Sequence, residues 1–167
     1  MLAHWLALVI FRIMRKAFIE KQEMMRRRPA RYKTRGASLG IAAAGTGELI
    51  SQVERGFSFQ SLRELESQSG VSISVIALII GIPERTLARR RTAGRLTSEE
   101  SGRLLRVSTV FEKAVELFDG DVTAAVQWLT TSHKALGHNL PLAYARSELG
   151  AREVENLIGR LEHGVFS

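Results

Sequence analysis

Apolar residues recur at helical spacing along most of the chain, and every element they predict is a helix. Phe59, Leu62 and Leu65 predict a helix over residues 57–70, which Gly70 ends. The longest predicted helix covers residues 98–118, and its apolar stripe consists of Leu104, Val107, Phe111, Val115 and Phe118. Shorter helices are predicted after Asp121, after Pro141 and over 151–163, and neither strand alternation nor an internal repeat is present. The sequence therefore predicts an all-α fold.

The stretch 71–94 reads as two short helices joined by a tight turn. Ile76, Ala77 and Ile80 form the apolar face of the first helix, and Gly81 can adopt the positive φ that ends it. Ile82 is expected to fill the turn, and Pro83 suits the start of the second helix, which runs to about Thr92 before Gly94. Leu87 is the inward residue of this second helix.

The second helix carries one buried side and one basic side, which is typical of the recognition helix of a helix-turn-helix. The predicted DNA-binding residues are Glu84, Arg85, Thr86 and Arg89 toward bases, and Arg90 and Arg91 toward phosphates. An ordinary helical pair with a solvated basic face remains the alternative at this point.

Local capping signals define the ends of the later helices. Thr97 and Glu100 have the spacing of a capping box, and Asp121 is placed to cap the helix that follows it. Pro141 is expected to begin a short helix, and Gly150 is expected to stop it.

Composition narrows the functional classes. The chain has 167 residues and no Cys, which excludes disulfides and thiolate chemistry and fits a cytoplasmic protein. Its four His share no metal-ligand spacing, and no nucleophile has a recognisable base, so neither an enzyme, a cofactor nor a metal site is predicted. Net charge is +7, but residues 96–167 hold seven basic and ten acidic residues, a net of −3. The basic parts favour phosphates, whereas the acidic end does not suit DNA.

Residues 1–56 are predicted to form a basic, flexible extension. Residues 1–35 hold ten Lys and Arg against two Glu, and a run rich in Gly and Ala follows. The apolar run 1–14 is too short to span a bilayer, so no membrane partner is expected. An interfacial helix over 1–14 and a translation start at a later Met remain alternatives.

The last third of the chain presents residues that suit a protein partner. Beyond the helix ending near His163 come two apolar residues close to the terminus, so Phe166 is either buried in the chain's own core or offered to a partner. The predicted partner surface consists of Trp128, Leu136, Gly137, Arg160, Glu162, His163, Val165 and Phe166.

These residues also carry a family resemblance. The run Ala-Leu-Gly at 135–137, Pro141-Leu142 and above all GAREVENLIGRLEHGVFS at 150–167 resemble the toxin-binding domain of the Xre–MbcA–ParS type II antitoxins. The helix-turn-helix ahead of them is similar to the Xre-like domain of that family. The resemblance covers about residues 57–167 and gives a helix-turn-helix domain at 57–96 and a dimerisation and toxin-binding domain at 97–167.

The resemblance implies a partner and a mechanism. The partner is a RES-domain toxin that consumes NAD⁺ or transfers ADP-ribose, and the C-terminal domain would cover its NAD cleft. The helix-turn-helix would bind operator DNA and repress the chain's own operon, as part of a homodimer within a toxin–antitoxin complex. A free-standing regulator with no toxin is the alternative function. Two positions depart from the family pattern: Leu140 stands where Thr is often found, and His138 stands where Gly is frequent.

Overall fold

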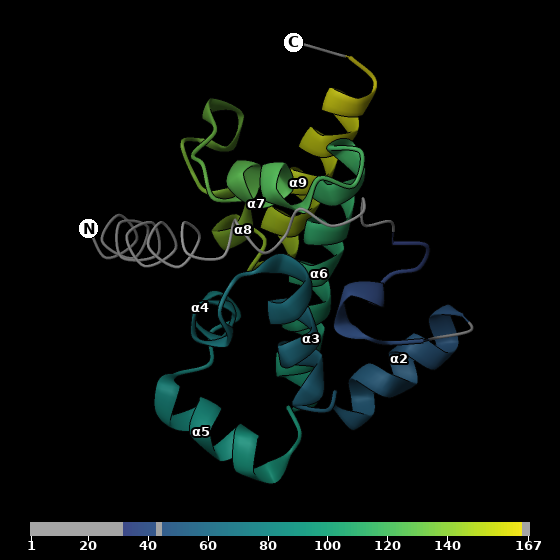
Figure 1. The fold of residues 1–167 in the computed structure, drawn as a ribbon, viewed down its shortest axis with the longest axis vertical. Helices are drawn as coiled ribbons and strands as arrows, with labels where there is room; N and C mark the ends of the chain where they lie inside the picture. The colour runs from purple at the N-terminus through teal and green to yellow at the C-terminus, as the bar shows by residue number, and fades with distance from the viewer. Residues whose placement is uncertain (1–31, 43–44, 165–167) are drawn as a thin grey trace.

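The computed structural model describes residues 32–42 and 45–164, and these form an all-α fold, as predicted (Figure 1). Within this part of the chain there are isolated β-bridges but no strand. The elements in order are η2 (Ala37–Leu39), α2 (Thr46–Arg55), α3 (Gln60–Ser69), α4 (Ile73–Ile79), α5 (Glu84–Ala93), α6 (Ser98–Leu117), α7 (Val122–Leu129), η3 (Lys134–Leu136), α8 (Pro141–Tyr144) and α9 (Glu148–Glu162).

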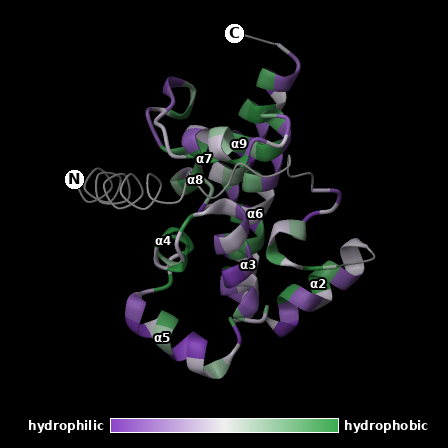
Figure 2. Ribbon diagram, in the orientation of Figure 1, coloured by the Kyte–Doolittle hydropathy of each residue, from purple (hydrophilic) through white to green (hydrophobic). Residues whose placement is uncertain are grey.

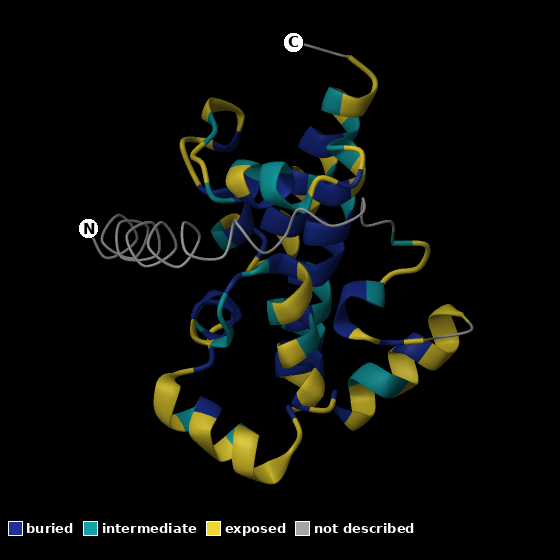
Figure 3. Cartoon of the chain, viewed as in Figure 1, coloured by how far each residue is buried: buried dark blue, intermediate teal, exposed yellow. Residues whose placement is uncertain are grey.

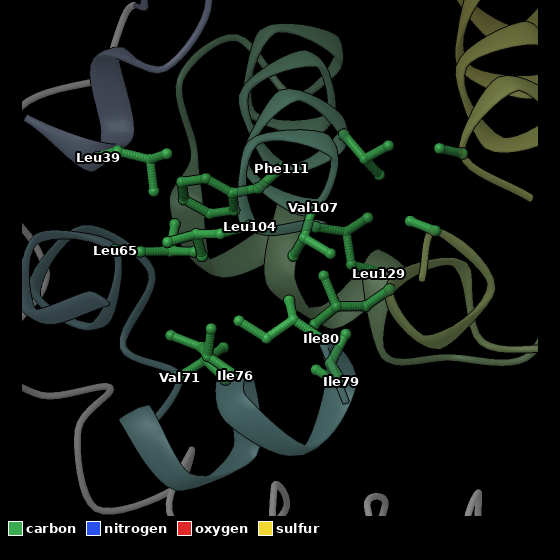
Figure 4. Close-up of a cluster of buried hydrophobic side chains, with 14 of the residues drawn as sticks. Leu39, Leu65, Val71, Ile76, Ile79, Ile80, Leu104, Val107, Phe111 and Leu129 are labelled. Carbon is green, nitrogen blue, oxygen red and sulfur yellow. The ribbon is translucent and has the colours of Figure 1, made fainter. Parts of the chain in front are cut away.

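Helix α6 is the centre of the fold, and most other elements pack on it. It contacts α7 and α9 along one part of its length and α2, α3 and η2 along another. Its side chains Leu104, Val107 and Phe111 meet Leu65 of α3 and Leu129 of α7 in one cluster (Figure 4). The buried side chains form a single core, so α6 connects the helix-turn-helix rigidly to the C-terminal helices.

The helix-turn-helix forms as predicted. Gly81 has φ 73° and ends α4, and the N–H of Ile82 donates to the carbonyl of Ala77 at 2.7 Å. Ile82 is buried in the turn, and Gly94 closes α5 with φ 70°. Each of these features is a local backbone requirement, which is why the sequence predicts them well.

The prediction of a flexible extension up to residue 56 is wrong for the residues that the structure describes there. Residues 46–55 form α2, which packs on α6, and Leu39, Ile41 and Leu49 are buried. The buried carboxylate of Glu112 holds this segment by accepting from the N–H of Gly36 and from the N–H and hydroxyl of Ser38. Residues 1–31 and 43–44 lie outside the described residues.

Gly150 does not stop a helix, contrary to the prediction. It lies in the first turn of α9, which begins at Glu148 after the Ser147 hydroxyl caps the N–H of Gly150 at 3.0 Å. A Cβ at Gly150 would lie 2.0 Å from the carbonyl oxygen of Tyr144. Glycine is required here because two backbone segments approach closely, and α9 starts three residues earlier than expected.

Candidate nucleic-acid interface and partner surface

Helix α5 projects from the body of the molecule and exposes most of its residues (Figures 1 and 3). Leu87 is its buried residue, and the helix packs mainly on α4. Figure 2 shows hydrophilic stretches along α5, in contrast to the apolar α4. A helix that buries little of itself leaves a large basic face to solvent.

The predicted DNA-binding residues fall into two groups. Glu84, Arg85, Arg89 and Arg91 are exposed, and Thr86 is half-buried. Within the described residues, neither Arg85, Arg89 nor Arg91 forms an ion pair with an acid. Arg85 and Arg89 are one helical turn apart and share a face, so their guanidinium groups are available together to a ligand.

Arg90 differs from its neighbours, because its charge is already paired. Its Nε donates to both carboxylate oxygens of Glu100, at 3.1 Å and 2.8 Å. The Glu100 side chain is only 7% exposed and that of Arg90 is 19% exposed. This pairing argues against the predicted role of Arg90 toward phosphates, and its side chain joins α5 to the start of α6.

Glu100 has a double role that the sequence shows only in part. The predicted capping box is present: the Thr97 hydroxyl accepts from the N–H of Glu100, and the Glu100 carboxylate accepts from the N–H of Thr97 at 2.8 Å. Burial alone would raise the pKa of Glu100, but the hydrogen bonds from Arg90 and Thr97 and the charge of Arg90 outweigh it and lower the pKa below its ordinary value. The carboxylate is thus held ionised where it restrains α5.

The predicted partner surface is only partly exposed. Trp128 is half-buried, and its ring lies 4.7 Å from that of His133 and 6.5 Å from that of Phe118. Leu136 is 4% exposed, so its expected exposure is wrong, whereas Gly137 beside it is exposed. Leu136 is part of the hydrophobic core, and the sequence of the turn alone does not show this burial.

The end of α9 presents the remaining residues of that surface. Arg160, Glu162 and His163 are exposed, and Gly164 follows with φ 65°. Element η3, which Gly137 follows, also contacts α9. In Figure 1 the C-terminal end of α9 lies opposite α5. Val165 and Phe166 lie outside the described residues.

Residues 32–42 and 45–164 also bear on two other classes of site. No group of three or more His, Asp or Glu is arranged there to hold a metal ion. No helix in this part of the chain has the length and apolar character needed to cross a bilayer.

Comparison with known proteins assigns both halves of the described chain to one family. The antitoxin Xre-like helix-turn-helix domain matches residues 48–108, and the antitoxin Xre/MbcA/ParS C-terminal toxin-binding domain matches residues 113–164. The protein "Antitoxin Xre" of Yersinia enterocolitica is 42% identical over 130 residues, which cover 77% of this chain and 88% of that protein. The chain belongs to the Xre antitoxin family. A second "Antitoxin Xre", from Photorhabdus laumondii, is 33% identical over 78% of this chain and 88% of that protein.

The structure gives the setting of the two positions at which the sequence departs from the expected family pattern, His138 and Leu140. His138 has φ 62°, a conformation that glycine adopts without strain, so the backbone here suits the Gly that the family resemblance leads us to expect. Leu140 precedes α8 and provides no side-chain cap, where the hydroxyl of a Thr would be available. The loop nevertheless closes, because the side chain of Asn139 donates to the carbonyl of Leu136 at 2.7 Å.

Proposed function

We propose that this antitoxin acts through two opposite ends of one rigid helical body. Helix α5 binds operator DNA and represses the chain's own operon, and the C-terminal domain neutralises a RES-domain toxin by covering its NAD cleft. The observation that carries the proposal is the exposed α5 with its unpaired Arg85 and Arg89, at the opposite end from the exposed last turn of α9 (Figure 1).

The DNA half of the proposal follows from the shape and charge of α5. A helix about 10–12 Å in diameter fits a major groove about 12 Å wide, provided that it projects from the protein surface. Glu84, Arg85 and Thr86 lie in the first turn of α5, and Arg89 lies one turn further along. Arg85 and Arg89 share a face and would reach base edges. Arg91 lies on the flank of α5, where it would meet the phosphate backbone.

The toxin half follows from charge. NAD is an anion, so a cleft that binds it should carry positive charge. Residues 96–167, with seven basic and ten acidic residues, have the opposite sign and would be steered toward such a cleft. Gly137, Arg160, Glu162 and His163, together with the half-buried Trp128 and the tail residues Val165 and Phe166, are the proposed contacts.

We also propose a cytoplasmic homodimer within the toxin–antitoxin complex. Helix-turn-helix proteins commonly bind as dimers to two half-sites, and the protein's two-fold symmetry then matches that of the operator. Light scattering of the purified chain is expected to give twice its 18.6 kDa mass.

A pair of variants separates the two halves. Deletion of residues 164–167 is expected to release inhibition of the RES toxin while leaving operator binding intact, and Arg85→Ala/Arg89→Ala is expected to do the reverse. Inhibition is measured as NAD⁺ consumption or ADP-ribose transfer by the co-purified toxin, and operator binding by fluorescence anisotropy.

The outcomes distinguish the proposal from its alternative. A free-standing regulator would form no complex with a RES toxin, and the tail deletion would then act only on dimerisation. If the deletion and the double Arg variant lower both activities equally, the assignment of one function to each end is wrong.

A further inference from the structure

Arg63 of α3 is not among the residues assigned to DNA binding above, yet its side chain is exposed beside α5. Its guanidinium carbon is 5.8 Å from the centre of the Phe59 ring, and that of Arg91 is also 5.8 Å from the same centre. Two groups that share one ring at this distance are at most about 12 Å apart. The two guanidinium groups therefore belong to one patch, although their residues come from different helices.

The backbone fixes this patch in place. The N–H of Phe59 donates to the carbonyl of Gly94 at 2.8 Å, and the N–H of Leu96 donates to the carbonyl of Phe57 at 2.9 Å. These bonds join the start of α3 to the end of α5. Phe59 itself is 4% exposed, so its ring is a fixed platform beneath the two cations.

The acids of α3 are used elsewhere and do not neutralise Arg63. Glu66 accepts from the N–H of Ile73 at the start of α4, at 3.1 Å. Glu64 accepts from the side chain of Gln60 at 3.0 Å and lies against Gly40. Among the described residues Arg63 forms no ion pair, and its polar atoms are free to bind an anion.

We propose that Arg63 is a phosphate-binding residue of the same DNA interface as α5. Together with Arg91, it would bind the phosphates of the strand that passes the C-terminal end of α5, next to Phe59. This inference rests on the proposed binding of α5 to DNA. When a recognition helix occupies the major groove, each of its flanks faces one sugar–phosphate strand. Arg91 is on the flank of α5 that faces α3, so Arg63 meets the same strand a short distance further along it.

The Phe59 ring restrains the guanidinium group of Arg63 before DNA binds. A guanidinium held over an aromatic face loses less conformational entropy on binding than one on a free side chain. Phosphate contacts position a protein on the duplex without reading its sequence. Arg63 is thus expected to add affinity for any duplex and to fix the register in which Arg85 and Arg89 meet bases.

The test is the salt dependence of DNA binding by the full chain. Anisotropy is measured with the duplex upstream of the chain's own coding sequence and with a shuffled duplex, for wild type and for Arg63→Gln. Losing one phosphate contact is expected to reduce the slope of log K against log salt by about 0.9, and to weaken binding about fivefold near 150 mM salt on both duplexes. Arg63→Lys, which keeps the charge, is expected to retain most of the slope.

Arg146→Gln is the matched control, because it removes the same charge from an exposed position between α8 and α9 that is assigned to neither DNA nor toxin binding. An Arg63→Gln slope equal to that of Arg146→Gln, with Arg85→Ala still weakening operator binding, overturns the inference and leaves the proposed function standing. If the wild-type chain binds neither duplex, the inference and the proposed DNA-binding function both fail.

Discussion

The ion pair between Arg90 and Glu100 is expected to set how firmly α5 is held, and Glu100→Gln tests this directly. Glutamine keeps the shape of the side chain and can still accept from the N–H of Thr97, so the capping box survives in part. The substitution removes the negative charge of the carboxylate, both of whose oxygens accept from Nε of Arg90. The substitution therefore isolates the contact between α5 and α6.

The size of the effect follows from burial. Removing one partner of a fully buried ion pair costs about 3–5 kcal/mol, and a hydrogen bond to a charged group contributes about 1.5–3 kcal/mol. Arg90 keeps 19% of its side chain exposed, so water compensates part of the loss. We expect the free energy of unfolding to fall by about 2 kcal/mol, and Tm by about 4–8 °C for a chain of this length.

Thermal denaturation followed by circular dichroism measures the change, and Glu99→Gln is the control. Glu99 pairs with Arg103 in the same turn of α6 but is 81% exposed, so its loss is expected to cost less than about 0.5 kcal/mol. DNA binding adds a second readout: Arg90→Ala is expected to leave the salt slope unchanged, whereas Arg91→Ala lowers it by about 0.9.

The pH dependence of the same pair has a defined sign. Because the folded-state pKa of Glu100 lies below its ordinary value of 4.5, its stabilising contribution is complete above pH 4.5 and is lost as pH falls through the lowered pKa. The stability gap between wild type and Glu100→Gln is expected to narrow at acidic pH. A Tm for Glu100→Gln within 1 °C of that of Glu99→Gln at neutral pH would refute the reasoning.

Three further substitutions test the local structure by their effect on Tm. Gly150→Ala is expected to destabilise the fold by about 2 kcal/mol, because the new Cβ would meet a carbonyl oxygen. Gly159→Ala in the same helix has open space and is expected to stabilise the fold by about 0.5–1 kcal/mol. Equal effects of the two substitutions would contradict the close approach at Gly150. His138→Gly is expected to stabilise by about 1 kcal/mol by relieving its positive φ, and a loss would show that its side chain is needed. Ser38→Ala removes a 2.6 Å hydrogen bond to a buried carboxylate and is expected to cost about 1.5–3 kcal/mol, unlike Ser67→Ala on the exposed face of α3; no difference between them would mean that the segment around residue 38 adds nothing to the fold.

The sequence predicts well those parts of the fold that local chemistry determines. Gly81 and Gly94 end helices because they take positive φ, and Thr97 with Glu100 starts α6 through bonds three residues apart. Such signals depend only on near neighbours. They locate the helix-turn-helix and, with it, the exposed basic face of α5.

The features that the sequence does not reveal depend on contacts distant along the chain. The order of residues 32–42 depends on Ser38 bonding to Glu112, 74 positions away. From the sequence, Arg90 is predicted to be another surface cation of α5. Its pairing with Glu100 depends on the turn between α5 and α6, which brings the two side chains together. The burial of Leu136 likewise follows from packing of η3 on α9, which no local pattern encodes.

The most direct test of the account is the ratio of affinities of the full chain for the duplex upstream of its own coding sequence and for a shuffled duplex, measured at one salt concentration near 150 mM. The account predicts that the wild-type chain prefers its own upstream duplex by about 10³-fold or more, and that Arg85→Ala/Arg89→Ala abolishes most of this preference while α9 and the fold stay intact. Equal affinity of the wild-type chain for the two duplexes would contradict it.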